Sequence, residues 1–147
     1  MIIAQGTEAG GHGQSVPLPT LVPLVVDACP DIPVVAAGGL ADGRGLAAAM
    51  MFGAEGVLMG TRFHASEEVE AHPEAKCRIV AARPSARSIR WPDPYTGRVL
   101  RNRHTERWLG HEDELDAATE QVGQDYTAAR ERRDFDIAGV IAGELAR

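Results

Sequence analysis

Three short apolar segments, each running into a glycine-containing loop, constrain the fold of this chain more than any other feature of its sequence. The segments cover residues 2–5, 32–37 and 56–59, and the loops that follow them contain residues 6–13, Gly38-Gly39 and Gly60-Thr61. Helical patterns separate the segments, and this alternation is typical of β/α units with a parallel sheet. The carboxyl ends of parallel strands meet at one edge, where α/β proteins bind ligands. The three loops therefore predict a binding site.

Two helices are predicted between these segments. Thr20 can cap a helix over residues 21–28, and Pro23 would then stand in its first turn, where proline is tolerated. Asp42 can cap a second helix, whose body covers residues 46–52 and ends at the glycine that follows. Both helices would connect one strand to the next, as a parallel sheet requires.

The pattern changes after Arg62, and we expect the rest of the chain to extend the same domain. Residues 83–110 contain several prolines and no sustained period, so an irregular segment is predicted there. The other expected elements are a helical turn at residues 66–68 and helices or turns at residues 73–82, opening with Pro73, 112–132 and 137–145. The extension of residues 83–147 is therefore expected to be irregular at first and then mostly helical.

Composition narrows the range of partners. The formal net charge is -6 at pH 7, which argues against nucleic acid or an anionic membrane surface as a partner. No apolar run approaches the roughly 20 residues that cross a bilayer, and the opening residues lack the pattern of a signal peptide. We therefore expect a cytoplasmic protein that binds neither nucleic acid nor membrane.

Cysteines and histidines give no metal-binding pattern. Cys29 and Cys77 do not form a C-x-x-C pair, so neither a disulfide framework nor a cysteine zinc site is expected. The histidines outside the first loop show no H-x-x-H or H-E-x-x-H spacing and are expected at the surface; they are His64, His72, His104 and His111. No metal site is predicted.

Two segments carry a resemblance to a known family. Residues 32–63, IPVVAAGGLADGRGLAAAMMFGAEGVLMGTRF, resemble the phosphate-binding half of FMN- and nucleotide-binding barrels. Residues 4–14, AQGTEAGGHGQ, resemble the motif of nitronate monooxygenases (2-nitropropane dioxygenase-like) and of related flavin-dependent enoyl reductases. In combination they resemble the nitronate monooxygenase family. The resemblance implies the C-terminal portion of a TIM (β/α)8 barrel, with about three parallel strands and their helices within residues 1–82.

The same resemblance implies an FMN cofactor and its contacts. In the family the reaction converts a nitroalkane or nitronate and O2 into a carbonyl compound and nitrite. The backbone N–H groups of Gly60 and Thr61, with the Thr61 hydroxyl, would hold the FMN phosphate beside Gly39. The implied cofactor-binding residues are Gln5, Gly10, Gly38, Gly39, Leu58, Met59, Gly60 and Thr61.

His12 matches the catalytic histidine of the family. An imidazole with a pKa near ~6.5 is largely neutral at pH 7 and can accept a carbon-bound proton, or it can lie beside a bound nitronate. Glu8 could be a second acid–base group, although a carboxylate that braces the loop is the stronger expectation. The basic stretch of Arg98, Arg101, Arg103, His104 and Arg107 is expected to be a solvated or interface surface, with binding of an anionic substrate group as the alternative.

Two other functions stay open. One is an enoyl-thioester reductase that uses FMN and a nicotinamide cofactor, and the other is a non-catalytic half-barrel that serves as a binding module. A complete barrel needs about 250 residues, whereas this chain has 147. We therefore expect a truncated copy, and the alternatives are a fragment that pairs with a separately encoded N-terminal half and a remnant without activity. A missing N-terminal half or another copy in a homo-oligomer would complete the sheet.

Overall fold

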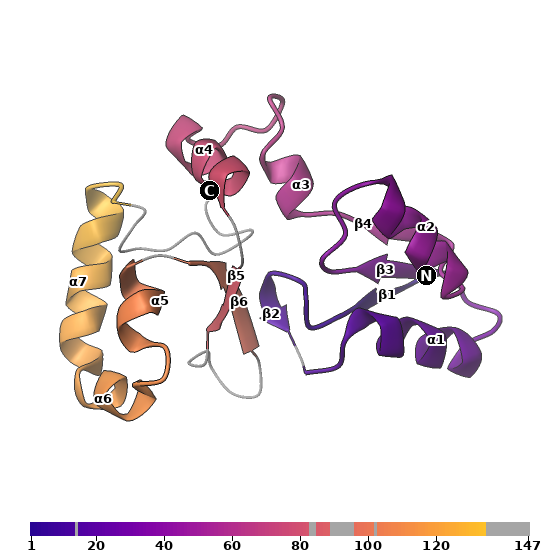
Figure 1. Cartoon of the computed structure of the whole chain (residues 1–147), viewed down its shortest axis with the longest axis horizontal. Coiled ribbons are helices and arrows are strands. Elements are labelled where there is room, and N and C mark those ends of the chain that lie inside the picture. The colour runs from indigo at the N-terminus through magenta and orange to yellow at the C-terminus, as the bar shows by residue number, and fades with distance from the viewer. Residues whose placement is uncertain (14, 83–84, 89–95, 102, 135–147) are drawn as a thin grey trace.

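The computed structural model describes residues 1–13, 15–82, 85–88, 96–101 and 103–134, and Figure 1 shows their arrangement. A parallel sheet with two helices lies at one end of the molecule. A small antiparallel sheet lies between this unit and a group of C-terminal helices. The helix or turn predicted at residues 137–145 lies outside the described residues.

The parallel sheet contains the three predicted strands. They are β1 (Ile2–Gln5), β3 (Val34–Ala37) and β4 (Gly56–Leu58), in the order β1-β3-β4. Their pairings are both parallel, so the three carboxyl ends lie at the same edge, and this prediction is confirmed. The observed strands are somewhat shorter than the apolar segments that predicted them.

Helices α1 (Leu18–Ala28) and α2 (Gly43–Met51) cover one face of this sheet. The core between them contains mostly small side chains, which let the helices lie close to the strands. The buried members are Ala4, Leu18, Val22, Val34, Ala36, Ala49 and Ala54. The described residues do not cover the opposite face of the sheet. Ile3 and Leu58 lie on that face, and each residue is 48% exposed.

The predicted start of α1 is wrong. Thr20 caps nothing: the helix begins at Leu18, after Pro17, and Pro23 lies inside it rather than in its first turn. The physical reason is a long-range contact, since the backbone N–H of Leu18 donates to Glu8 Oε2 at 3.0 Å. A carboxylate ten residues earlier satisfies the first free N–H group, so a local side-chain cap is unnecessary.

The predicted cap of α2 is confirmed. Asp42 Oδ1 accepts hydrogen bonds from the backbone N–H groups of Arg44 at 2.9 Å and Gly45 at 3.4 Å. Gly53, with φ +95°, ends the helix in the left-handed region, as expected. The side chain of Arg44 donates to Asp42 as well, and these hydrogen bonds lower the pKa of the Asp42 carboxyl to about 2.

We expect Asp42→Ala to lower Tm by roughly 2–4 °C, because α2 loses its cap. The folded state lowers the pKa of this carboxyl from 3.8 to about 2, so its contribution is complete above about pH 5 and is lost as pH falls toward 2. Thermal unfolding of both proteins between pH 7 and 3 measures this, with Asp42→Asn as a control that keeps an acceptor but no charge. An equal difference in Tm at pH 7 and 3 would contradict the assignment.

The second half of the chain differs from the prediction of an irregular segment at residues 83–110. Strands β5 (Ser85–Ser88) and β6 (Thr96–Leu100) pair with each other, and β6 also pairs with β2 (Gly11–Gly13) of the first loop. Residues 11–13 are therefore a strand rather than part of a flexible loop. The pairing of β2 with β6 joins segments far apart in the sequence, so no local period revealed it.

The remaining elements are short helices. Helix α4 (Pro73–Ala81) begins at proline, as predicted. The predicted turn at residues 66–68 is not helical, and a four-residue helix, α3 (Thr61–His64), lies before it. The single helix predicted at residues 112–132 is two, α6 (Glu112–Ala117) and α7 (Thr119–Glu131), after α5 (Arg103–Trp108). Among the described residues, no helix is both long and apolar enough to cross a bilayer.

Candidate active site

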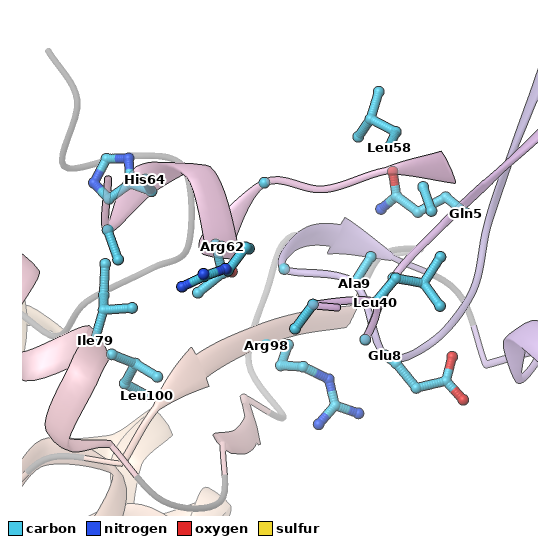
Figure 2. A pocket seen from close by; sticks show the side chains of 18 of the residues that line it. Gln5, Glu8, Ala9, Leu40, Leu58, Arg62, His64, Ile79, Arg98 and Leu100 are labelled. Carbon is cyan, nitrogen blue, oxygen red and sulfur yellow. The ribbon is translucent and has the colours of Figure 1, made fainter. Parts of the chain in front are cut away.

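The carboxyl ends of the three parallel strands open into a cavity of about 630 Å3. Its walls come from the loops after β1, β3 and β4, from α3 and α4, and from β6 (Figure 2). This volume is within the range of small-molecule and cofactor sites. The structure thus has a cavity at the edge of the sheet where the three loops predicted a binding site.

Seven of the eight predicted cofactor residues line this cavity: Gln5, Gly10, Gly38, Gly39, Leu58, Gly60 and Thr61. Met59 is half-buried and is not among the described residues that line it. Successive residues of an extended chain point to opposite sides, and Leu58 takes the cavity side. The sequence motifs therefore identify residues that gather in space, with Met59 as the exception.

Gly38 and Gly39 let the loop after β3 pack against the loop after β1. Both have positive φ angles, +120° and +67°. A Cβ at Gly38 would lie 2.8 Å from the backbone nitrogen of Ala9, and one at Gly39 would lie 2.9 Å from Glu8 Cβ. These positions need glycine for both conformation and space. Their first role is therefore to bring two loops of the cavity together.

Gly60 is different, because a Cβ there would meet no atom of the described residues within 4 Å. Its backbone is in the right-handed helical region, with φ -89° and ψ -72°. Within the described residues, the backbone N–H groups of Gly39, Gly60 and Thr61 donate no hydrogen bond. Free N–H groups from two loops at one cavity are the donors that a phosphate group accepts from.

The loop after β1 is anchored at several points. Gly6 donates its N–H to the carbonyl of Ala37 at 2.9 Å, and Thr7 donates to Val16 at 2.9 Å. Glu8 accepts from Leu18, so its carboxylate braces the loop against α1, which was the stronger expectation for this residue. The loop is thereby fixed to both the sheet and its first helix.

His12 lies in β2, where its backbone is paired with Gly97 of β6. Its side chain lies outside the described part of the structure, so its role remains a prediction. The strand pairing nevertheless places the His12 backbone next to β6, whose residues Arg98, Val99 and Leu100 line the cavity. A segment predicted to be irregular thus forms a wall of the site.

The basic stretch is divided among three environments. Arg98 is half-buried, lines the cavity and donates from Nε to the carbonyl of Thr7 at 3.1 Å, so the prediction of a solvated surface is wrong for it. Arg101 forms an exposed ion pair with Glu106, and the guanidinium of Arg107 lies 4.5 Å from the ring centre of Trp108. The side chains of Arg103 and His104 lie outside the described part.

His64 is a cavity residue that sequence reasoning missed. It is expected at the surface, but it is half-buried on α3, and its Nε2 is buried without a hydrogen-bond partner among the described residues. Figure 2 shows it on the same helix as Arg62. His72 instead caps α4 by accepting from Glu74, and His111 pairs with Glu114. No group of His, Cys, Asp or Glu suited to a metal ion occurs among the residues that the structure describes.

Comparison with known proteins extends these observations. The chain is 40% identical over 130 residues to the nitronate monooxygenase npaC of Metarhizium robertsii, covering 76% of this chain and 36% of npaC. It is 60% identical over 80 residues to an octahydro-indene-carboxyl-CoA dehydrogenase of Rhodococcus jostii, covering 54% of this chain and 22% of that enzyme. The chain thus spans well under half the length of these curated relatives.

A solved structure gives the same fold. FabK of Thermotoga maritima superposes with a TM-score of 0.71 at 37% identity, over 99% of this chain and 44% of FabK. FabK is a TIM-barrel enzyme, so the prediction of a barrel portion with parallel strands is confirmed. The family model described as nitronate monooxygenase matches residues 1–136, which confirms the resemblance seen in the two motifs. The chain therefore belongs to the nitronate monooxygenase family.

Proposed function

We propose that this chain forms the cofactor-phosphate side of an FMN-dependent oxidoreductase of the nitronate monooxygenase type. The substrates would be a nitroalkane or nitronate and O2, and the products a carbonyl compound and nitrite. The observation that carries the proposal is that Gly39, Gly60 and Thr61 line one cavity, and that the described residues offer no acceptor for their backbone N–H groups. Family membership supports it independently.

The residues present fit an FMN phosphate. Gly60 and Thr61 would donate their N–H groups from one loop and Gly39 from another, and the Thr61 hydroxyl lies on the same wall. The open space beside Gly60 would let the phosphate approach the backbone closely. Gln5 and Gly10 would contact the flavin from the loop after β1. When bound, FMN supplies the redox chemistry of the reaction.

His12 would move the proton. A neutral imidazole accepts the proton bonded to the carbon next to the nitro group, and the resulting cation then stabilises the nitronate anion. Apolar side chains on the cavity wall, among them Leu40, Ile79 and Leu100, would exclude water from this anion. We propose that the uncovered face of the β1-β3-β4 sheet, at Ile3 and Leu58, is covered by the N-terminal half of a barrel or by a second copy.

A second candidate is supported by two similarities. The relative of highest identity among those compared above is named a carboxyl-CoA dehydrogenase, and FabK is an enoyl reductase. The alternative substrate is therefore an acyl or enoyl thioester, with a nicotinamide cofactor. Steady-state assays separate the two, because nitrite release with O2 consumption supports the first function and thioester-dependent nicotinamide turnover supports the second.

The cofactor is tested by FMN titration of the wild-type chain and Gly60→Ala, followed by flavin fluorescence. We expect Gly60→Ala to weaken FMN binding roughly tenfold or more, because the added methyl group fills the space that the phosphate needs. Its Tm without FMN should not fall, since the backbone at Gly60 suits alanine. Gly43→Ala, also in open space but outside the cavity lining, is the matched control. Equal FMN affinity of all three proteins would contradict the phosphate site.

A further inference from the structure

Arg98 contacts the loop after β1 at two places. Its backbone pairs with Gly11 in the β2–β6 ladder, and its Nε donates to the carbonyl of Thr7 at 3.1 Å. The two contacts lie at the two ends of residues 7–11, immediately before His12. Arg98, on a strand distant in the sequence, thus contacts both ends of this part of the loop.

Without such a contact, the loop after β1 would sample many conformations. Glycines at positions 6, 10, 11 and 13 give it a high conformational entropy when it is not held. The anchors at Gly6, Thr7 and Glu8 hold only its first residues, through the sheet and α1. Toward His12, the contacts that the structure describes come from β6. Figure 2 shows Arg98 on this strand beside the loop that carries Glu8 and Ala9.

We propose that Arg98 is a positioning residue, which holds the loop that leads into His12. This role rests on the proposed function, in which His12 moves the proton. A guanidinium is suited to it, because a charged donor makes a stronger hydrogen bond to a carbonyl than a neutral donor does. Lysine carries the charge but cannot place a donor at the position of Nε.

The β5–β6 hairpin thereby becomes part of the catalytic apparatus. Val99 is buried and Leu100 lines the cavity beside Arg98, so the hairpin both closes the site and fixes the loop. Arg101, one residue beyond β6, offers a matched control. It is a surface arginine whose ion pair with Glu106 does not reach the loop.

Hydrogen exchange followed by mass spectrometry tests the contact without requiring activity. We expect Arg98→Ala to speed exchange of the peptide covering residues 6–13 about tenfold or more, Arg98→Lys to give a smaller increase, and Arg101→Ala to give none. Arg98→Gln, which keeps a donor on a shorter side chain, replaces the alanine variant if that protein does not fold. Wild-type exchange in the folded Arg98 variants would overturn the proposal.

Kinetics test the consequence for His12. For whichever substrate class the wild type turns over, we expect Arg98→Ala to lower kcat about tenfold or more with KM changed less than threefold, and Arg98→Lys to restore part of kcat. A rise in KM at unchanged kcat would assign Arg98 to substrate binding and overturn the positioning role. If His12→Ala keeps wild-type kcat, the proposed role of His12 fails, while the exchange experiment still decides whether Arg98 holds the loop.

Discussion

Replacing His12 by alanine should lower kcat/KM for a neutral nitroalkane by ~10²–10⁴-fold, the usual contribution of a general base. The loss should be smaller for a nitronate prepared in advance, since its proton has already been removed. FMN affinity should stay within a factor of a few, because the proposed phosphate donors lie in other loops. Nitrite release and O2 consumption with both substrate forms measure the effect.

His111→Ala is the control for removal of a histidine, since His111 is exposed and pairs only with Glu114 among the contacts described. The pH dependence adds a second criterion. For the neutral substrate, wild-type kcat/KM should fall toward acidic pH, because a protonated imidazole cannot accept the proton. His12→Ala should lose this acidic limb. If His12→Ala loses activity equally with nitroalkane and nitronate, His12 does not act as the base. Its remaining role would be to stabilise the bound nitronate anion.

The parallel half of the fold could be predicted because its signals are local. Each strand is an apolar run that ends at glycine, and Asp42 and Gly53 mark the two ends of α2 within the sequence itself. The start of α1 could not be found in this way. Its first N–H is satisfied by Glu8, and a carboxylate ten residues earlier leaves no capping pattern at Leu18.

The antiparallel sheet was missed for a related reason. Strand β2 is made of Gly11, His12 and Gly13, which have no intrinsic preference for extended structure, and it exists through pairing with β6. Arg98 was grouped with other arginines as a solvated surface, because composition does not reveal which of them faces a loop. His64 had no motif around it, and only its place on α3 shows that it faces the cavity.

The cofactor loops were predicted from motifs, but the motifs do not distinguish two uses of glycine. At Gly60 the missing side chain leaves open space at the cavity, as a ligand site requires. At Gly38 and Gly39 it makes room for the loop after β1. The same residue type therefore leaves space at the cavity in one loop, where we propose that the phosphate binds, and allows packing in the other. Substitution separates the two roles.

Gly38→Ala should be among the most damaging single substitutions in the parallel half. Its φ of +120° is strained for any L side chain, and the new Cβ would lie 2.8 Å from the backbone nitrogen of Ala9, which cannot move independently of its loop. Strain and overpacking together should lower the free energy of unfolding by about 2–4 kcal/mol. FMN binding should weaken as well, because the loop holding Gly10 is pushed away from the one holding Gly39.

Gly43→Ala separates this effect from the general consequence of replacing glycine. Gly43 is the first residue of α2, its added Cβ meets nothing within 4 Å, and alanine favours a helix by up to ~1 kcal/mol over glycine. Its stability in urea should therefore equal or exceed that of the wild type. If Gly38→Ala also unfolds at the wild-type urea concentration, the two loops are not packed as described. Reduced FMN affinity without loss of stability would instead show that Gly38 contacts the ligand directly.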